Sequence, residues 1–519
     1  MSQLRLRPRP SRTLRTAKGL HLRPAGRGRL GTRLALLGSL AATSLTAAAP
    51  ASAAPVQASP AAGFRDSIGI QMHHSFGGYA SDQTSTDTLA RMLNDLGIWH
   101  VRDSVCLNTE AACVKPRARM AALRAKAAEK KTMPAVDYLL GITREVETHP
   151  GRAERDADIE RALKALSTPP LAGAVAGIEQ TNEPDLQNYR GWPQIAVADD
   201  VAIRAKLAEP RFASLANLPL LSPALGHPNS TAYLLQAAWP TLRPITPNFH
   251  PYPPAWGGPE EALKAPCNIG KLTVWDCMRR LAPGTRAPWA TESGYSTTGD
   301  KTSVMWVSRQ TQAVYLPRLL LDNYAKGIGR TYLYELNDLS PEIASATSGF
   351  GLYESKYIDP WSIVSSRAKV AAYAVARMNS RIGEAGAKVA AGGGLDFDLR
   401  DAAGKLLPES AVRRVLLRRN DGTMVLALWQ PKAVWSNVQL KQRTLDVPDL
   451  PVSVKINTGI SGGWNATMFR PSIDETATKA LATTTQAFTA QVGPDVTLID
   501  LRGANYRVPV PGGPVNLDE

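Results

Sequence analysis

The sequence contains few of the residues that build metal and redox sites. Its 519 residues include only four cysteines and seven histidines, and none of these forms a CxxC or HExxH motif. This spacing argues against the usual zinc sites. A Gly-rich phosphate-binding loop is also missing after the first predicted strand, and no segment after residue 53 is apolar enough to cross a membrane.

Acidic residues are absent from the first 53 positions, which hold ten basic ones. An apolar run at 34–49 (LALLGSLAATSLTAAA) and the small residues ASA at 51–53 follow this basic segment. The order predicts a secretory signal peptide over residues 1–53, with a membrane anchor as the less favoured alternative. Its removal leaves 50 basic and 45 acidic residues, a net charge of about +5. We therefore expect a secreted, extracellular protein with no nucleic-acid partner and no membrane anchor.

The four cysteines are Cys106, Cys113, Cys267 and Cys277. Export permits disulfide bonds, and the spacing suggests two local loops, Cys106–Cys113 and Cys267–Cys277. Four cysteines nevertheless allow three pairings, and free thiols are the alternative.

Short apolar segments alternate with Ala-, Arg- and Leu-rich helical segments from about 66 to 382. Strands are predicted at 68–72, 99–105, 133–140, 172–180, 219–225, 245–252, 287–293 and 329–337. Helices are predicted at 84–97, 115–131, 152–166, 197–208, 229–237, 303–326 and 363–380. Apolar strands followed by helices indicate parallel strands buried on both faces, and eight such units predict a (β/α)8 TIM barrel. A doubly wound open sheet is the competing architecture.

The pattern changes after the barrel. Residues 386–505 contain alternating polar and apolar runs, and RNDG at 419–422 is a favourable hairpin turn between two of them. This region predicts a small antiparallel β-sandwich as an accessory domain. Residues 54–65 are interpreted as a linker, and the Pro- and Gly-rich residues 506–519 as an extended tail.

Carboxylates follow two of the predicted barrel strands. Glu179, Glu183 and Asp185 surround the end of the fourth strand in EQTNEPD, and Glu292 ends the seventh in ATESGYS. The carboxyl ends of barrel strands carry the active site, and the fourth and seventh strands lie across the mouth from each other. Two converging carboxylates are what glycoside hydrolysis requires.

Asn182-Glu183-Pro184 and Glu292-Ser293-Gly294 resemble the corresponding motifs of clan A retaining glycoside hydrolases, TIM-barrel glycosidases of which many are bacterial and secreted. The resemblance covers residues 66–380. It implies that Glu183 is the acid/base, that Glu292 is the nucleophile, and that Asn182 contacts the 2-hydroxyl of the sugar.

The same resemblance implies further binding residues. Arg102 follows from the second strand, and His250 and Tyr252 from HPY in the sixth. Hydrogen bonds from an Arg and a Tyr would keep Glu292 ionised, whereas Glu183, with no cation beside it, would hold its proton near neutral pH. Core polar residues are the alternative interpretation of Arg102 and His250.

The eighth strand departs from the family, which often has a Trp there. Here Tyr334 and Glu335 occupy this place, together with Asn337, and Glu335 is a candidate specificity contact. One of His73 and His74 at the end of the first strand is expected to line the pocket, and His74 is assigned to substrate binding.

Several features have a structural alternative. NEP can be a turn that closes a strand, Glu179 is expected to be structural, and Asp185 is expected to cap a loop or helix. GISGG at 459–463 matches an esterase nucleophile motif, but it lies in a β-rich region rather than between a strand and a helix. The tryptophans Trp429, Trp435 and Trp464 could stack on sugars, although a role in the sandwich core is favoured.

The sequence therefore predicts a secreted, monomeric retaining O-glycoside hydrolase. It would act on an oligo- or polysaccharide by double displacement through a glycosyl-enzyme intermediate, with neither a metal ion nor an organic cofactor. A non-catalytic glycan-binding or cell-wall protein on a barrel scaffold and a transglycosylase using the same two Glu are the alternatives. The loop at 251–260 and the loop at 267–277 are expected to shape the cleft.

Overall fold

The computed structural model describes residues 55–503. Within that range it leaves out 76–83, 130–133, 188, 228–229, 238–244, 268, 282–286, 298–304, 341–347, 360–361, 384–392, 437–441, 458–462 and 474–478. The predicted signal peptide, the predicted tail and nearly all of GISGG lie outside the described residues.

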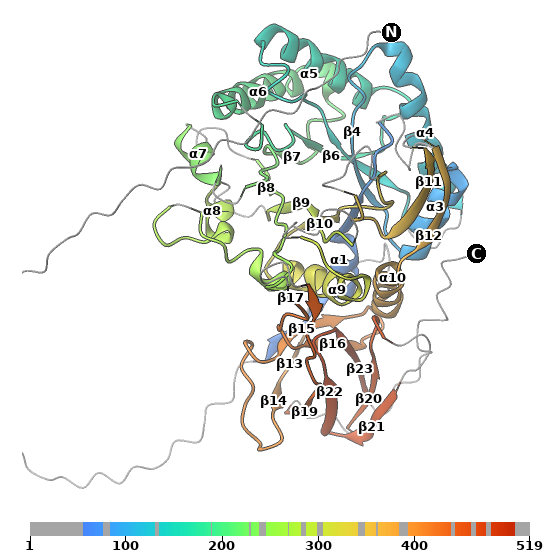
Figure 1. The fold of residues 1–519 in the computed structure, drawn as a ribbon, viewed down its shortest axis with the longest axis vertical. Helices are drawn as coiled ribbons and strands as arrows, with labels where there is room; N and C mark the ends of the chain where they lie inside the picture. Colours follow the sequence, from blue (N-terminus) through green and yellow to red (C-terminus); the bar gives the residue numbers. More distant parts are fainter. Residues whose placement is uncertain are drawn as a thin grey trace, which may run out of the picture. The chain divides into compact units, whose positions relative to one another are not determined.

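Eight parallel strands form a near-closed barrel in the first part of the described chain (Figure 1). They are β3 (Ile68–Gln71), β4 (His100–Ser104), β5 (Asp137–Gly141), β6 (Val175–Glu179), β7 (Leu220–Leu221), β8 (Asn248–Phe249), β9 (Trp289–Ser293) and β10 (Arg330–Leu333). Except for β7 and β8, each strand pairs with its neighbour in sequence, and β10 returns to β3, so the predicted TIM barrel is confirmed and the open sheet is excluded.

The strands β7 and β8 are shorter than the sequence suggested. Their segments contain Pro219, Pro223, Pro247 and Pro251, which cannot donate backbone hydrogen bonds to a ladder. The barrel closes between them through the isolated bridges Leu221↔Thr246 and Leu225↔Phe249. The β7 and β8 segments therefore share only these bridges and no continuous ladder.

Helices alternate with the strands, as Figure 1 shows. They are α3 (Thr86–Leu96), α4 (Glu110–Glu129), α5 (Arg152–Ser167), α6 (Trp192–Leu207), α7 (Thr231–Gln236), α8 (Val274–Leu281), α9 (Arg309–Ala325) and α10 (Val370–Ile382). The hydroxyl of Ser85 accepts from Thr88 N at the start of α3, and Gly97 ends that helix with φ 66°. A side-chain N-cap and a left-handed C-cap glycine are the expected helix boundaries.

Alternate residues of the strands face the barrel interior. Leu139, Leu221 and Tyr332 fill this interior, whereas Ile70, Val101 and their equivalents belong to the larger core that also contains residues of the helices. Gly69 faces Tyr332 closely enough that a Cβ at position 69 would lie 2.3 Å from the ring. The first strand is glycine there because the tyrosine ring takes the space.

Two helix predictions were wrong or incomplete. The helix expected at 363–380 begins at Val370, and the residues before it form the strand β12 (Ser362–Ala368), paired antiparallel with β11 (Tyr353–Asp359). The β-branched start of this segment, IVSS, favours a strand over a helix. The helix α8 was not predicted. It has only eight residues, which is too short for a clear helical repeat of apolar positions in the sequence.

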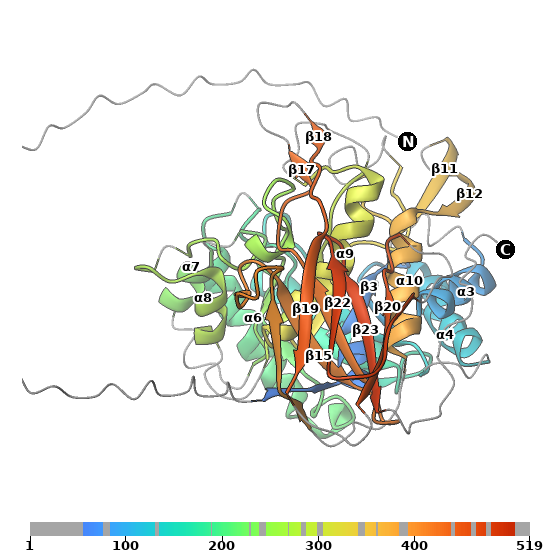
Figure 2. The same ribbon diagram turned by 90° about the horizontal axis from the view of Figure 1, so that it is seen from below.

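The C-terminal region is β-rich, as predicted, and Figure 2 shows its strands in orange and red. A six-stranded sheet has the order β2-β15-β16-β23-β20-β21, and a three-stranded sheet has the order β14-β19-β22. The strands are β2 (Ser59–Pro60), β14 (Phe397–Arg400), β15 (Arg413–Arg418), β16 (Met424–Trp429), β19 (Leu450–Ile456), β20 (Trp464–Phe469), β21 (Lys479–Thr485), β22 (Ala487–Val492) and β23 (Thr497–Gly503). Residues from both sheets share one buried cluster, which makes this region a sandwich.

The RNDG segment lies at the turn between β15 and β16, where it was predicted. The residues interpreted as a linker do more than connect. In this segment β1 (Val56–Gln57) pairs with β13 (Gly394–Leu395), and β2 pairs with β15, before the short helix α1 (Ala61–Asp66). Val56 and Ala58 also pack in the sandwich core.

Both expected disulfides are present, Cys106–Cys113 and Cys267–Cys277. Trp429, Trp435 and Trp464 are 1%, 4% and 7% exposed, so they belong to the interior and offer no stacking face. None of the described helices is long and apolar enough to cross a membrane.

The contact between Gly69 and Tyr332 predicts a strong response to one added methyl group. Gly69→Ala should lower the free energy of unfolding by about 1–3 kcal/mol, because the ring cannot move within the filled barrel. Gly141→Ala, where the nearest atom to a new Cβ is 3.4 Å away, is the matched control on the same sheet. Chemical denaturation of the two variants measures the difference, and equal stabilities would contradict the packing described for the barrel interior.

Candidate active site

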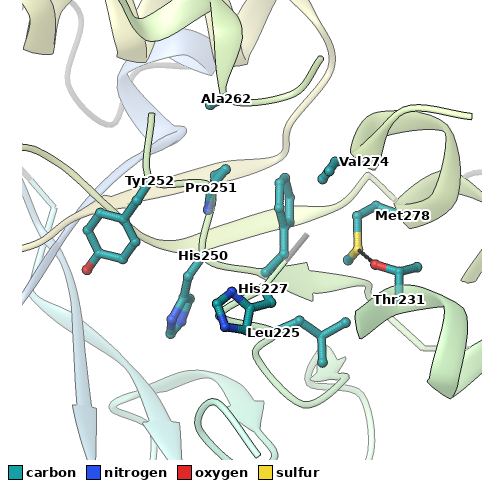
Figure 3. A pocket seen from close by; sticks show the side chains of 11 residues that line it. Leu225, His227, Thr231, His250, Pro251, Tyr252, Ala262, Val274 and Met278 are labelled. Carbon is teal, nitrogen blue, oxygen red and sulfur yellow. Dashed lines mark hydrogen bonds between the residues drawn. The ribbon is translucent and has the colours of Figure 1, made fainter. Parts of the chain in front are cut away.

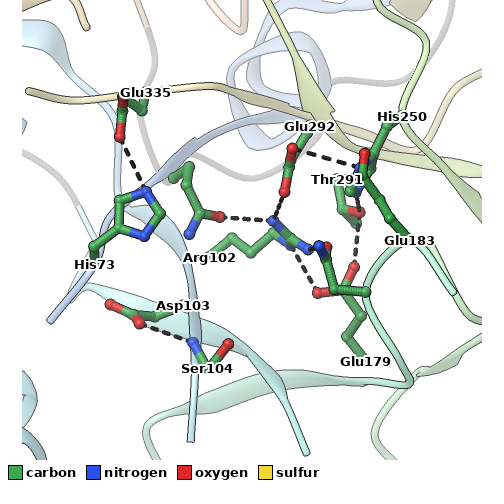
Figure 4. A network of polar contacts seen from close by, with 12 residues as sticks. His73, Arg102, Asp103, Ser104, Glu179, Glu183, His250, Thr291, Glu292 and Glu335 are labelled. Atoms are coloured by element: carbon green, nitrogen blue, oxygen red, sulfur yellow. Dashed lines mark hydrogen bonds and ion pairs between the residues drawn. The ribbon is translucent and has the colours of Figure 1, made fainter. Parts of the chain in front are cut away.

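Arg102 of β4 lies at the centre of a buried polar network at the carboxyl ends of the strands (Figure 4). Its Nε donates to Glu179 at 2.7 Å, and its Nη1 donates to Glu292 at 2.5 Å. Its Nη2 donates to Asn182 Oδ1 at 2.7 Å, and Nη1 also donates to Gln71 Oε1 at 2.8 Å. Burial alone would lower the pKa of Arg102, but the carboxylates of Glu179 and Glu292 raise it, so the guanidinium stays charged.

Glu179 is one anchor of this network rather than part of the open site. Its carboxylate also accepts from Asn248 Nδ2 at 2.6 Å and from the Thr291 hydroxyl at 2.7 Å, and the residue is 1% exposed. This matches the structural role expected for it. Asn248 was not predicted, although it alternates with His250 and Tyr252 and therefore shares their face of the strand.

Glu292 presents its carboxylate to the site from the end of β9. One oxygen accepts from Arg102, and the other accepts from the Tyr252 hydroxyl at 2.8 Å. His250 Nδ1 lies 3.4 Å from this second oxygen. The sequence prediction that Arg102 and Tyr252 contact Glu292 is thus confirmed by the geometry, and these contacts fix the carboxylate in one orientation.

Glu183 differs from the expectation, because a potential cation lies beside it. His250 Nδ1 is 2.7 Å from Glu183 Oε1, and His250 Nε2 is 3.1 Å from the Thr291 hydroxyl. Burial raises the pKa of the Glu183 carboxyl, but the hydrogen bond and charge of His250 outweigh it and leave that pKa below 4.5. Burial lowers the pKa of His250, but Glu292 and Glu183 together bring it above 6.5. The expectation that no cation lies beside Glu183 was therefore wrong, because His250 is hydrogen-bonded to its carboxylate.

The backbone of Glu183 is unusual. It has φ 41°, in the left-handed region that residues other than glycine rarely adopt. Glu183 N donates to Ala224 O at 2.9 Å, and the Asp185 carboxylate accepts from the N–H groups of Gly226 and His227 at 3.0 and 2.8 Å. Asp185 thus caps the next loop, as expected, and the two loops together hold Glu183 in this conformation.

His73 rather than His74 faces the network. His73 Nε2 lies 3.0 Å from Glu335 Oε2, and its ring meets the ring of Tyr334 edge-on at 5.8 Å. Burial lowers the pKa of His73 to about 4. Burial and then the charges of Arg119 in α4 and of His73 lower the pKa of His74, which is 1% exposed. Consecutive residues beyond a strand end have no fixed alternation, so the sequence could not choose between them.

Glu335 and Tyr334 follow β10, the last strand of the barrel. Glu335 is 1% exposed, and burial together with the charge of Asp338 raises its pKa well above 4.5. Its Oε1 has no hydrogen-bond partner among the described residues. Tyr334 is half-buried and packs edge-on against Tyr252 and Phe350, with ring centroids 6.4 and 5.5 Å apart.

Glu183, His250 and Glu292 could also be considered as metal ligands, because one atom from each lies within 4.8 Å of the others. Both oxygens of Glu292 already accept from Arg102 and Tyr252. A guanidinium beside the carboxylate supplies the positive charge that a metal ion would otherwise bring, so the donor set fits a metal poorly.

A pocket lined in part by His250 and Tyr252 adjoins this site (Figure 3). Leu225, Phe249 and Met278 contribute apolar surface, and His250 and Tyr252 lie at one end of it. A Cβ at Gly226, which also lines this pocket, would lie 3.0 Å from Glu183 Oε1. The glycine therefore lets the pocket wall approach the carboxylate.

No protein-family model and no curated protein matches the sequence. Solved structures do match. A family 39 glycoside hydrolase from Bacteroides cellulosilyticus aligns with a TM-score of 0.55 at 13% identity, over 86% of this chain and 81% of its own. A glucosidase from Croceicoccus marinus aligns with a TM-score of 0.54 at 12% identity, over 88% of this chain and 99% of its own. A β-xylosidase from Caulobacter crescentus gives 0.53 at 15%, over 86% and 98%.

The fold of this chain is thus one found in glycoside hydrolases, a TIM barrel followed by a β-sandwich. At these identities the likeness concerns the fold. The roles of the individual carboxylates depend on the geometry described above.

The pair of Glu183 and His250 predicts a pH dependence of stability. The raised pKa of His250 gives stabilisation that is complete below pH 6.5 and is lost as pH rises through the raised value. The lowered pKa of Glu183 gives stabilisation that is present above pH 4.5 and is lost as pH falls through the lowered value.

The stability advantage of the wild type over His250→Phe should therefore be largest between pH 4.5 and 6.5. Urea unfolding of both proteins across the pH range measures this difference. His149→Phe, a change of the same kind at a more exposed position, is the control. A difference that does not vary with pH would contradict the pairing.

Proposed function

We propose that this protein is a retaining O-glycoside hydrolase that acts on an oligo- or polysaccharide. The observation that carries the proposal is the approach of two carboxylates, because an oxygen of Glu183 and an oxygen of Glu292 lie within 4.8 Å of each other. Retaining enzymes hold their two carboxyl groups about 5–5.5 Å apart, whereas inverting enzymes leave room for a water and hold them about 6.5–9.5 Å apart. The fold shared with known glycosidases supports the same conclusion.

The contacts of the two carboxylates support a different role for each. Glu292 is held by Arg102 and Tyr252 at both oxygens, which orients it toward one ring carbon of a bound sugar. Glu183 adjoins the proton-holding His250 and the pocket of Figure 3, where a leaving group would lie. Glu292 is therefore the nucleophile and Glu183 the acid/base.

In the first step, Glu292 attacks the anomeric carbon while the bond to the leaving oxygen breaks. Glu183 protonates that oxygen, and the proton comes from the pair, moving from His250 Nδ1 to Glu183 Oε1 over their hydrogen bond. The products are the free leaving group and a glycosyl ester on Glu292. When the substrate excludes water, the charged forms of Glu183 and His250 are less well solvated. This favours the state in which Glu183 is protonated and His250 is neutral.

In the second step, Glu183 accepts a proton from water as the water attacks the anomeric carbon from the face that the leaving group vacated. The ester bond to Glu292 breaks and restores the carboxylate. Two inversions at one carbon give net retention. Asn182, whose amide oxygen accepts from Arg102 at 2.7 Å, is placed to contact the sugar through its free amide nitrogen.

We also propose that the protein is secreted. The basic and apolar order of residues 1–53 has the form of a signal peptide. Two disulfides are consistent with an oxidising compartment.

A hydrolysis screen of residues 54–519 against aryl glycosides and polysaccharides tests the reaction. Glu292→Ala should abolish cleavage, and Glu183→Ala should lower kcat about 10²–10⁴-fold with poor leaving groups. Dinitrophenyl glycosides, whose leaving group needs no proton, should lose less. Azide should then react with the Glu183→Ala glycosyl ester and give a glycosyl azide of retained configuration.

Glu154→Ala, at an exposed position in the first turn of α5, is the control and should keep full activity. An inverted first product would contradict the double displacement. Products extended at high acceptor concentration would identify a transglycosylase, and sugar binding without any cleavage would identify a glycan-binding protein.

The substrate class follows from Glu335 and His73. Both lie on the side of Arg102 away from Glu183 (Figure 4), so they face sugar atoms remote from the bond that breaks. A buried carboxyl with a raised pKa and an unpartnered oxygen fits a neutral hydroxyl group, since a sugar carboxylate would add negative charge beside Glu292. We propose that Glu335 binds a hydroxyl at C3 or C4 of a neutral sugar.

Deoxy analogues of the glycoside that the enzyme cleaves test this contact. Removal of the contacted hydroxyl should lower kcat/KM of the wild type by about 10²–10⁴-fold, because the buried carboxyl is left unpaired. In Glu335→Ala this penalty should shrink to about tenfold or less, whereas Glu335→Gln, a neutral isostere, should retain most of it. Glu354→Gln on the surface is the control. The same penalty in Glu335→Ala would exclude the contact.

A further inference from the structure

A buried ion pair of the barrel, Arg318–Glu260, is hydrogen-bonded to the sandwich. Arg318 of α9 donates through Nε to Glu260 at 2.9 Å and through Nη2 at 2.5 Å. Trp429 at the end of β16 donates its indole N–H to Glu260 Oε1 at 2.7 Å. The three side chains are 0%, 3% and 1% exposed in the order Arg318, Glu260 and Trp429. A buried pair requires this full set of hydrogen bonds, since either charge alone would be costly.

The sandwich contributes backbone groups to the same junction. Arg318 Nη1 donates to the carbonyl oxygens of Lys432 and Pro494 at 2.9 and 3.1 Å. The Tyr315 hydroxyl accepts from Val434 N at 2.9 Å and lies 3.3 Å from Ala255 O. Two points of one segment, Ala255 and Glu260, are therefore tied to the sandwich through side chains of α9.

This segment, residues 251–261, follows β8 and begins in the candidate site. Its second residue is Tyr252, whose hydroxyl donates to Glu292. Pro251 O accepts from the Ser293 hydroxyl at 2.9 Å, next to Glu292 in the chain. Four prolines and few backbone hydrogen bonds leave the segment dependent on outside contacts, because β8 itself pairs over only two residues.

We propose that the accessory sandwich is a working part of the active site, in which Trp429 acts through Glu260 as a positioning residue. It holds the segment 251–261 so that the Tyr252 hydroxyl stays on Glu292. The role goes beyond the proposed reaction, since it assigns a function to the second domain. It also explains why Trp429, with its one polar atom bound to Glu260, is not available to a sugar.

Trp429→Phe keeps the ring and removes the indole N–H, and Trp464→Phe is a matched control. Trp464 is buried in the same sandwich, in a cluster formed by Ala58 and by residues between 395 and 501. In the full-length mature protein, hydrogen exchange of residues 252–262 should rise about tenfold or more in Trp429→Phe, the change expected for a lost hydrogen bond to a charged group. In Trp464→Phe it should stay at the wild-type rate.

Kinetics provide a second readout that a loss of stability alone would not give. Trp429→Phe should lower kcat about tenfold and change KM by less than about threefold, since it displaces a group that orients the nucleophile. In a Tyr252→Phe background the same change should lower kcat by less than about threefold. Both substitutions act through the hydrogen bond between Tyr252 and Glu292, so the second has little left to remove. Tyr315→Phe, which removes the second attachment, should behave as Trp429→Phe does if Trp429→Phe fails to fold.

Unchanged exchange of 252–262 in Trp429→Phe would overturn the proposal, as would effects of Trp429→Phe and Tyr252→Phe that simply multiply. If the wild type cleaves no glycoside, the proposed reaction fails, and hydrogen exchange alone decides whether the sandwich holds the segment.

Discussion

The buried guanidinium of Arg102 is the interaction on which the site depends. A charge removed from water needs compensation on every side, and Arg102 receives it from Glu179, Glu292, Asn182 and Gln71. These partners come from the ends of three strands, β3, β6 and β9, and Arg102 itself comes from a fourth, β4. The requirement to satisfy one cation therefore fixes four strand ends relative to each other, and it places Glu292 and Asn182 as a result. The carboxylate of Glu179, which accepts from Arg102 Nε, helps to make the burial of Arg102 possible.

Much of the fold could be predicted because parallel strands buried on both faces leave long apolar segments in the sequence. Seven or more residues were expected in each of the fifth and sixth strands. Each of these strands has only two residues in the sheet, because prolines interrupt the backbone hydrogen bonds. The strand β12 was hidden by the Ala-rich helix that follows it. The short strands before residue 60 could not be recognised, since their partners lie in another domain and pairing at such distance leaves no local signal.

The candidate site was predicted as far as residue types and strand ends could determine it. Arg102, Tyr252 and Glu292 meet as expected, because each lies in or just after a strand whose direction is fixed by the barrel. The contact of His250 with Glu183 could not be foreseen. It requires the left-handed backbone of Glu183 and the closure between β7 and β8, which are properties of the assembled barrel. The choice of His73 over His74 likewise depends on the path of the chain beyond a strand.

The pairing of β2 with β15 has a consequence for the order in which the chain folds. Ser59 and Pro60 are among the first described residues, but their partners Leu417 and Arg418 are synthesised more than 350 residues later. The edge strand β2 can therefore pair only after β15 has been synthesised. Contacts of such sequence separation are slow to form. Once formed, the pairing joins a segment that precedes the barrel to a segment that follows it. Opening of the sandwich would remove this pairing from the segment that leads into the first barrel strand, so we expect the stability of the barrel to depend on that of the sandwich.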